Sequence, residues 1–162
     1  MSWPDSIAVG RSGAPALAAP EVLATETLNA NQSTPIGSVI VSRDGDNLFV
    51  EFSLTASGWT MSTTYLWLGT DLSTFPKGPG KYTYKHYLNP PGTYDKFGPV
   101  SLSSVLGLTK CGTFYVAAHA AVQQNGGSQV SASAGSAGNW PNKYFPVTVA
   151  CQTPTATPTR TP

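Results

Sequence analysis

The sequence has 162 residues and a formal net charge of +1, and 10% of its residues are charged, against roughly 25% in a typical soluble domain. This length suits one domain of ordinary size with some tail left over. The scattered Lys and Arg residues form no basic stripe, which argues against nucleic acid as a partner. No stretch approaches the ~20 apolar residues needed to span a bilayer. Gly, Pro, Ser and Thr replace the charged residues, which favours short strands and turns over long helices.

Strand patterns follow one another along the first half of the chain. Residues 21–28 predict a weak first strand, and residues 36–43 predict a second. In the next segment Leu48, Val50, Phe52 and Leu54 alternate with other residues, the period of two that is typical of a half-buried strand. The turn between the second and third strands reads Asp-Gly-Asp-Asn at 44–47. It predicts a hairpin, because a calcium loop would be longer and would carry a bidentate Glu.

The second half continues the same pattern. Residues 59–69 predict a core strand with Tyr65, Trp67 and Gly69 on one face and Leu66 and Leu68 on the other. After a loop at 71–80, strands are predicted at 81–87, 93–102, 112–122, 129–133 and 143–150. About eight antiparallel strands without a helical period predict an all-β fold, an antiparallel β-sandwich of the Ig-like or jelly-roll-like kind.

Composition divides the chain into three parts. Residues 1–20 predict an extended N-terminal segment, residues 21–152 the sandwich module, and residues 153–162 a linker that reads TPTATPTRTP. Proline removes amide donors and favours polyproline II, so the last segment suits a semi-rigid spacer. Threonines beside prolines are frequent O-glycan acceptors in exported stalks. We therefore expect one module of a larger secreted or cell-surface protein, covalently joined to a neighbouring module.

The two cysteines predict a disulfide. Cys111 opens the most apolar strand, and Cys151 closes the last strand before the Thr/Pro segment. A bridge between them would add ~3–4 kcal/mol on the chain-entropy model and would indicate an oxidising, extracellular compartment. The alternatives are two free thiols, or half of a metal site that has no Cys-x-x-Cys partner.

Four segments stand in a recognisable order: GWTMSTTYLWLGT at 58–70, FPKGPGKYTYKH at 75–86, KCGTFYVAAHAAV at 110–122 and GNWPNKYF at 138–145. Together they resemble a poorly characterised group of secreted bacterial and fungal β-sandwich modules. The resemblance covers residues 36–149 and implies an extracellular domain that stands beside anchors, linkers and other sandwiches. It implies no particular activity. This chain has Ser131-Ala132-Ser133 where the group has a Thr-Ala-Trp segment.

His119, which lies among alanines, is the first candidate for catalytic chemistry. It is either a catalytic base or metal ligand, or a hydrogen-bonded histidine that fixes a loop through backbone, Tyr or Ser partners. No HxH, HExxH or GxSxG signature accompanies it. A glycosidase needs two carboxylates across a cleft, and nothing marks a pair among Glu51, Asp71 and Asp95. We expect no catalytic site, no metal and no cofactor.

Aromatic residues are the more suggestive feature. Planar rings stack on the apolar faces of sugars, while amides and charged groups bind the hydroxyls. The candidate platform consists of Tyr82, Tyr84, Tyr87 and Trp140. Tyr82, Tyr84 and the segment 85–87 follow a period-2 pattern that would line three rings, or two rings and a histidine, along one sheet face. The alternative is that most rings fill the core, and Trp59 and Trp67 are the first candidates for that.

These patterns predict a non-catalytic extracellular accessory module whose partner is a polysaccharide or cell-surface glycan. A different interpretation is a structural or adhesive subunit of a surface layer or filament, in which residues 1–20 add to a neighbour's sheet edge and the chain self-associates. A polysaccharide-active hydrolase or lyase is a third interpretation. Asn31 begins the sequon Asn31-Gln32-Ser33, and whether it carries a glycan stays open.

Overall fold

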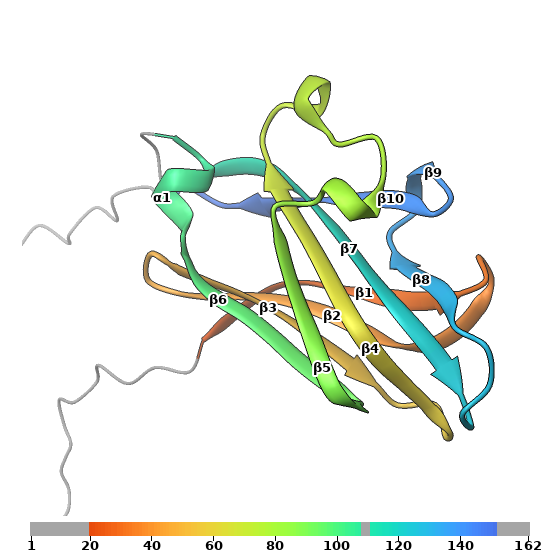
Figure 1. Cartoon of the computed structure of the whole chain (residues 1–162). Helices are drawn as coiled ribbons and strands as arrows, with labels where there is room; N and C mark the ends of the chain where they lie inside the picture. The colour runs from red at the N-terminus through yellow and green to blue at the C-terminus, as the bar shows by residue number, and fades with distance from the viewer. Residues whose placement is uncertain (1–19, 108–110, 152–162) are drawn as a thin grey trace, which may run out of the picture.

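The structure is a computed structural model, and it describes residues 20–107 and 111–151. Figure 1 shows strands β4, β5 and β7 crossing in front of strands β1, β2 and β3. The predicted N-terminal segment, apart from residue 20, and the predicted linker at 153–162 lie outside the described residues.

Antiparallel strands make up most of the described chain. They are β1 (Glu21–Ala30), β2 (Thr34–Asp44), β3 (Asn47–Leu54), β4 (Trp59–Gly69), β5 (Tyr84–Gly92), β6 (Tyr94–Ser101), β7 (Gly112–Gln124), β8 (Val130–Ala134), β9 (Ala137–Asn139) and β10 (Asn142–Val149). Short helices η3 (Leu72–Thr74), η4 (Pro79–Lys81) and α1 (Leu102–Val105) lie between them. The predicted all-β antiparallel class is confirmed. The predicted strand at 81–87 begins later than expected, because residues 79–81 form η4.

The strands form a nearly closed sheet in the order β5-β4-β7-β8-β1-β2-β3-β6. Strand β10 pairs with the first half of β7, from Gly112 to Val116, whereas β8 pairs with its second half, from His119 to Val122. Strands β5 and β6 stand at the two ends of this order. Side chains connect them: the Asp95 carboxylate on β6 lies 2.8 Å from His86 Nδ1 on β5 and accepts a 2.6 Å hydrogen bond from Thr64 on β4.

One large apolar core fills the space inside this sheet. The alternating side chains predicted for β3 point into it, as do Phe114, Val116 and Val122 of β7. Burying side chains of this size contributes roughly 1.5–3 kcal/mol each relative to exposure. Trp59 belongs to this core, as predicted, whereas Trp67 is buried on the opposite side of β4.

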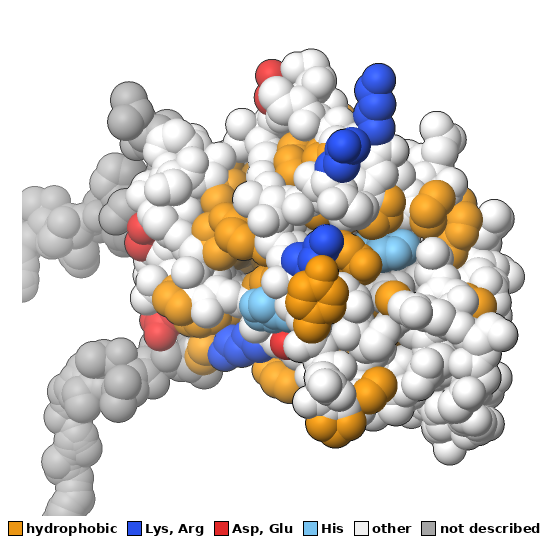
Figure 2. Space-filling model, viewed as in Figure 1, with side chains coloured by type: hydrophobic (Ala, Val, Ile, Leu, Met, Phe, Trp, Pro, Cys, Tyr) orange, Lys and Arg blue, Asp and Glu red, His pale blue; other side chains and the backbone are white. Residues whose placement is uncertain are grey.

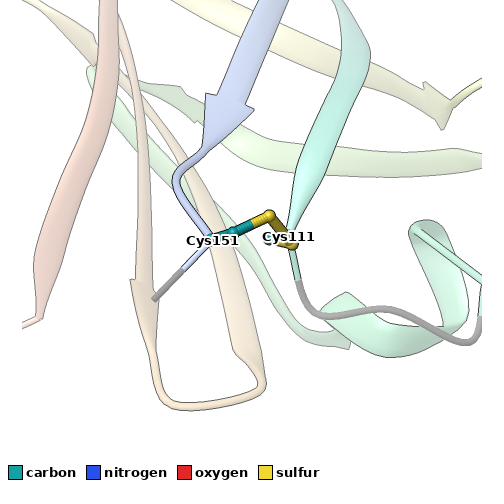
Figure 3. Close-up of a disulfide and its surroundings, with 2 residues drawn as sticks. All are labelled: Cys111 and Cys151. Carbon is teal, nitrogen blue, oxygen red and sulfur yellow. A yellow bond between two sulfur atoms is a disulfide. The ribbon is translucent and has the colours of Figure 1, made fainter. Parts of the chain in front are cut away.

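The predicted disulfide is confirmed. Figure 3 shows Cys111, just before β7, bonded to Cys151, just after β10, and their Cα atoms are 4.8 Å apart. The bridge joins two strands whose ends already pair through Gly112 and Val149. It therefore fixes the point at which the chain leaves the sheet. Among residues 20–107 and 111–151, no helix is long and apolar enough to cross a membrane.

Candidate binding face

The side of β4, β5 and β7 that points away from the core carries a second cluster of rings, and we call this side the outer face. Buried Trp67, Tyr82 and Ala117 form its centre. Partly buried aromatic residues pack around them: Tyr65, Phe75, Tyr115 and Tyr144. The Phe75 ring lies 4.9 Å from that of Trp67 and 5.2 Å from that of Tyr144, measured between centroids. The loop that carries η3 and η4 is thereby fixed against the sheet.

A pocket of about 400 Å³ adjoins this cluster where β9 turns into β10. Three rings line it, those of Phe75, Trp140 and Tyr144, together with the polar side chains of Lys77, Asn139 and Asn142. The pocket therefore combines flat apolar surfaces with amide and ammonium groups, the mixture that suits a polyhydroxylated ligand.

Hydrogen bonds hold both sides of this pocket together. The Asn142 side chain donates to the Pro76 carbonyl at 2.8 Å and accepts from the Tyr82 hydroxyl. Burial raises the pKa of Tyr82 above its usual value, so the hydroxyl remains a donor. Gly138 has φ +84°, and a Cβ there would lie 2.6 Å from the Asn142 carbonyl oxygen. Glycine is therefore required for this turn to close.

A row of paired residues connects the pocket to the rest of the outer face. It crosses the sheet from Lys85 through Tyr65 and His119 to Ser133. The Ser133 hydroxyl donates to the Pro141 carbonyl at 2.6 Å. Since that uses its single proton, the 2.9 Å contact between His119 Nδ1 and Ser133 Oγ has the ring nitrogen as donor.

His119 is thus hydrogen-bonded to the serine that holds the Pro141 carbonyl, the kind of contact that the second interpretation of the sequence expects. Burial lowers the pKa of His119 to about 4, and a backbone hydrogen bond with Pro141 opposes that shift in part. The imidazole is neutral at pH 7 as a result. Its ring also packs at 5.3 Å from that of Tyr65.

Beyond this row the outer face presents an exposed ring. Tyr87 is 75% exposed, and Tyr65 is half-buried beside it. The Lys85 ammonium lies between the two, 5.2 Å from the Tyr65 centroid and 5.8 Å from the Tyr87 centroid. Figure 2 shows hydrophobic side chains gathered across this face with basic side chains between them.

The structure does not bring the four predicted platform rings together. Tyr82 is 6% exposed beneath the η3–η4 loop, which corrects the expectation that it is exposed. Tyr84 points to the inner side, 6.3 Å from Phe97, and lines a separate pocket of about 300 Å³. Of the four, Tyr87 is exposed on the outer face, and Trp140 is half-buried and lines the pocket there. The predicted alternation does not hold at Tyr82, because this residue follows η4 and precedes β5, so its side chain does not follow the alternation of that strand.

Sequence reasoning missed several residues of the face. Tyr65, Phe75 and Tyr144 belong to it, and so do the amides of Asn139 and Asn142. The segment GNWPNKYF contained the available signal, since two amides flank its tryptophan.

The acidic residues considered for catalysis each have a structural partner. Asp71 accepts from the Ser73 amide at 2.9 Å, and hydrogen bonding to Ser73 lowers the pKa of this carboxyl. Glu51 accepts from the Tyr94 hydroxyl at 2.7 Å. Asp95 binds Thr64 and His86. The His86–Asp95 pair was not anticipated from the sequence.

Comparisons of the chain with protein-family models, with curated proteins and with solved structures found no match. The resemblance of its four segments to secreted sandwich modules therefore stays a prediction.

Proposed function

We propose that this protein is a non-catalytic extracellular accessory module that binds polysaccharide across its outer face. The observation that carries the proposal is the Trp140 pocket, because it sets rings beside amides and an ammonium group. The exposed Tyr87 ring lies on the same side of the sheet and extends this surface. Sugar rings stack on such flat aromatic surfaces while their hydroxyls bond to the neighbouring polar groups.

The row from Lys85 to Ser133 supports a binding surface longer than one sugar. It spans four neighbouring strands, roughly 14 Å at 4.7–4.9 Å per strand. Pro141 and the pocket lie beyond Ser133. An oligosaccharide that contacts both Tyr87 and Trp140 would run across the strands along this row.

We infer a sandwich in which β5, β4, β7 and β10 pack over β1, β2, β3 and β6, since one apolar core contains side chains from both groups. The Cys111–Cys151 bridge supports an oxidising and therefore extracellular compartment.

The test is a glycan array followed by affinity electrophoresis on the glycans that score. We expect retention by at least one polysaccharide. We expect Trp140→Ala to weaken it at least tenfold, because truncating an aromatic anchor in a binding pocket typically costs about 2 kcal/mol, and about 1.4 kcal/mol corresponds to a factor of ten. Tyr94→Ala is the matched control, because Tyr94 is a 51% exposed ring on β6, outside the outer face. A chain that no soluble or insoluble polysaccharide retains would refute the proposal.

A second candidate, a structural or adhesive subunit, is favoured by the edge of β1. Strand β8 pairs only with Leu28–Ala30, so among the described residues the part of β1 at 21–27 pairs on one side alone, with β2. An unpaired edge accepts a strand from another chain. Size-exclusion chromatography and electron microscopy with and without residues 1–20 test this candidate. A monomer in both cases counts against it.

A further inference from the structure

Charge is unevenly distributed over the described chain. Five carboxylates lie in or beside β1, β2 and β3: Glu21, Glu26, Asp44, Asp46 and Glu51. Strands β4, β5, β7, β8, β9 and β10 contain no Asp or Glu. The carboxylate nearest them in sequence, Asp71, is exposed at the start of η3, accepts a hydrogen bond from the Ser73 amide and lines the separate pocket beside Tyr84. The next nearest, Asp95, is 16% exposed and is bonded to Thr64 and His86. The strands of the outer face therefore carry no negative charge, and no carboxylate lines the pocket that contains Trp140.

Three lysines follow this face at intervals of four residues. Lys77 lines the Trp140 pocket, Lys81 ends η4, and Lys85 lies between the rings of Tyr65 and Tyr87. Among the described residues none of the three forms an ion pair, since the pairs there are Arg43–Glu21 and His86–Asp95. In Figure 2 basic side chains lie over the middle and upper part of this face, and most acidic ones lie near its margin.

Unpaired cations beside strands that carry no carboxylate attract an anion. We propose that the ligand of the outer face is an acidic polysaccharide whose sugars carry carboxylates, that is, a polyuronate. This inference rests on the proposed carbohydrate-binding function and names its substrate class. Lys77 and Lys85 bind the carboxylates, while Trp140 and Tyr87 stack on the sugar rings.

The position of Lys85 favours a carboxylated sugar over other polyanions. A uronate carries its carboxylate at the edge of a pyranose ring, so a sugar stacked on Tyr87 presents that charge beside the ring. Lys85 holds its ammonium group there, 5.8 Å from the Tyr87 centroid. Nucleic acid would instead require a basic stripe matched to phosphates at short, regular spacing. The three lysines at 77, 81 and 85 have few other basic side chains near them in sequence and do not form such a stripe.

The charged contacts are exposed, so their contribution is modest and depends on salt. Exposed ion pairs contribute on the order of 0.2–1 kcal/mol each, which corresponds to a loss of up to about fivefold for one lysine. At 1 M salt the Debye length falls to about 3 Å, from about 10 Å at 0.1 M, and the preference for an acidic ligand should largely disappear.

The test compares polygalacturonate with its fully methyl-esterified form, which has the same backbone without the charge, by affinity electrophoresis and titration calorimetry. Alginate and a glucuronan extend the comparison to other polyuronates. We expect binding of at least one acidic form about tenfold or more tighter than its ester or neutral counterpart at 50 mM salt. Lys77→Gln with Lys85→Gln should reduce that ratio at least threefold.

Lys96→Gln is the matched control, because the Lys96 ammonium also lies beside a ring, 4.5 Å from the Phe49 centroid, but on β6 and β3. It should leave the ratio unchanged, and circular dichroism of each variant verifies folding. Equal binding of acid and ester, or binding of neutral glycans only, overturns the inference and leaves the proposed function standing. Absence of binding to every glycan overturns both. Equally tight binding of dextran sulfate or a single-stranded oligonucleotide also overturns it, since the face would then be a general polyanion binder.

Discussion

Replacing His119 with Gln should change how the stability of this protein depends on pH. His119 is 6% exposed and donates from Nδ1 to Ser133, and an amide can also donate to that hydroxyl. In the wild type, burial lowers the pKa of the imidazole from 6.5 to about 4. The variant keeps a polar, hydrogen-bonding side chain but has no group that titrates in this range.

The magnitude follows from linkage. Between about pH 6.5 and pH 4 the unfolded chain holds a proton on His119 that the folded chain does not. The free energy of unfolding therefore decreases as the pH falls through this interval. At 1.36 kcal/mol for each pKa unit, the shift corresponds to about 3 kcal/mol. This contribution is fully present above pH 6.5 and is lost by about pH 4.

The assay is urea unfolding at several pH values from 7.5 to 4.0, followed by circular dichroism. All other residues are the same in both proteins, so their effects cancel in the difference between the two stability curves. We expect the wild type to lose about 3 kcal/mol more than the variant over this interval. Parallel curves would refute the reasoning, since they would mean that His119 has an ordinary pKa in the folded protein.

Further predictions concern stability and use the same urea assay at pH 7. Ser133→Ala removes the hydroxyl that donates to the Pro141 carbonyl and contacts His119, and should cost about 1–3 kcal/mol; an unchanged midpoint would contradict the buried network. Cys111→Ser with Cys151→Ser should cost about 4 kcal/mol for a separation of 40 residues, with the reduced wild type behaving alike. Thr64→Val removes the hydroxyl that donates to the Asp95 carboxylate and should cost about 1.5–3 kcal/mol. An unchanged midpoint would contradict this, since it would mean that water replaces the hydroxyl.

The sequence predicted those strands in which one face is buried and the other is not. In β4 the predicted separation of Tyr65 and Trp67 from Leu66 holds, because neighbours pair at a fixed register and a slip of one residue would exchange the faces. The bounds of β4 also match the prediction at both ends. The disulfide was predictable because the chain has two cysteines, one at the start of a predicted strand and the other at the end of the last one.

The candidate site was less predictable because its parts come from distant segments. The pocket combines residues 75–77 with residues 138–144, and no local pattern indicates that these segments meet. Tyr82 illustrates the same limit: its neighbours Phe75 and Asn142, not its own strand, decide that it is buried. The His86–Asp95 pair likewise depends on how β5 approaches β6 across the closure of the sheet.

The small side chain of Ala117 on β7 determines how closely the ring cluster of the outer face packs on the sheet. Ala117 pairs with Trp67 on the outer face and is fully buried under the ring cluster. A larger side chain at 117 would need space that Trp67 and Tyr82 now occupy, and it would lift the loop that carries Phe75 and Lys77. The small residue thus determines the height of the loop above the sheet, and through it the shape of the pocket. A buried position of this kind lies beneath the surface, yet it sets where the rings and lysines of the proposed binding face stand.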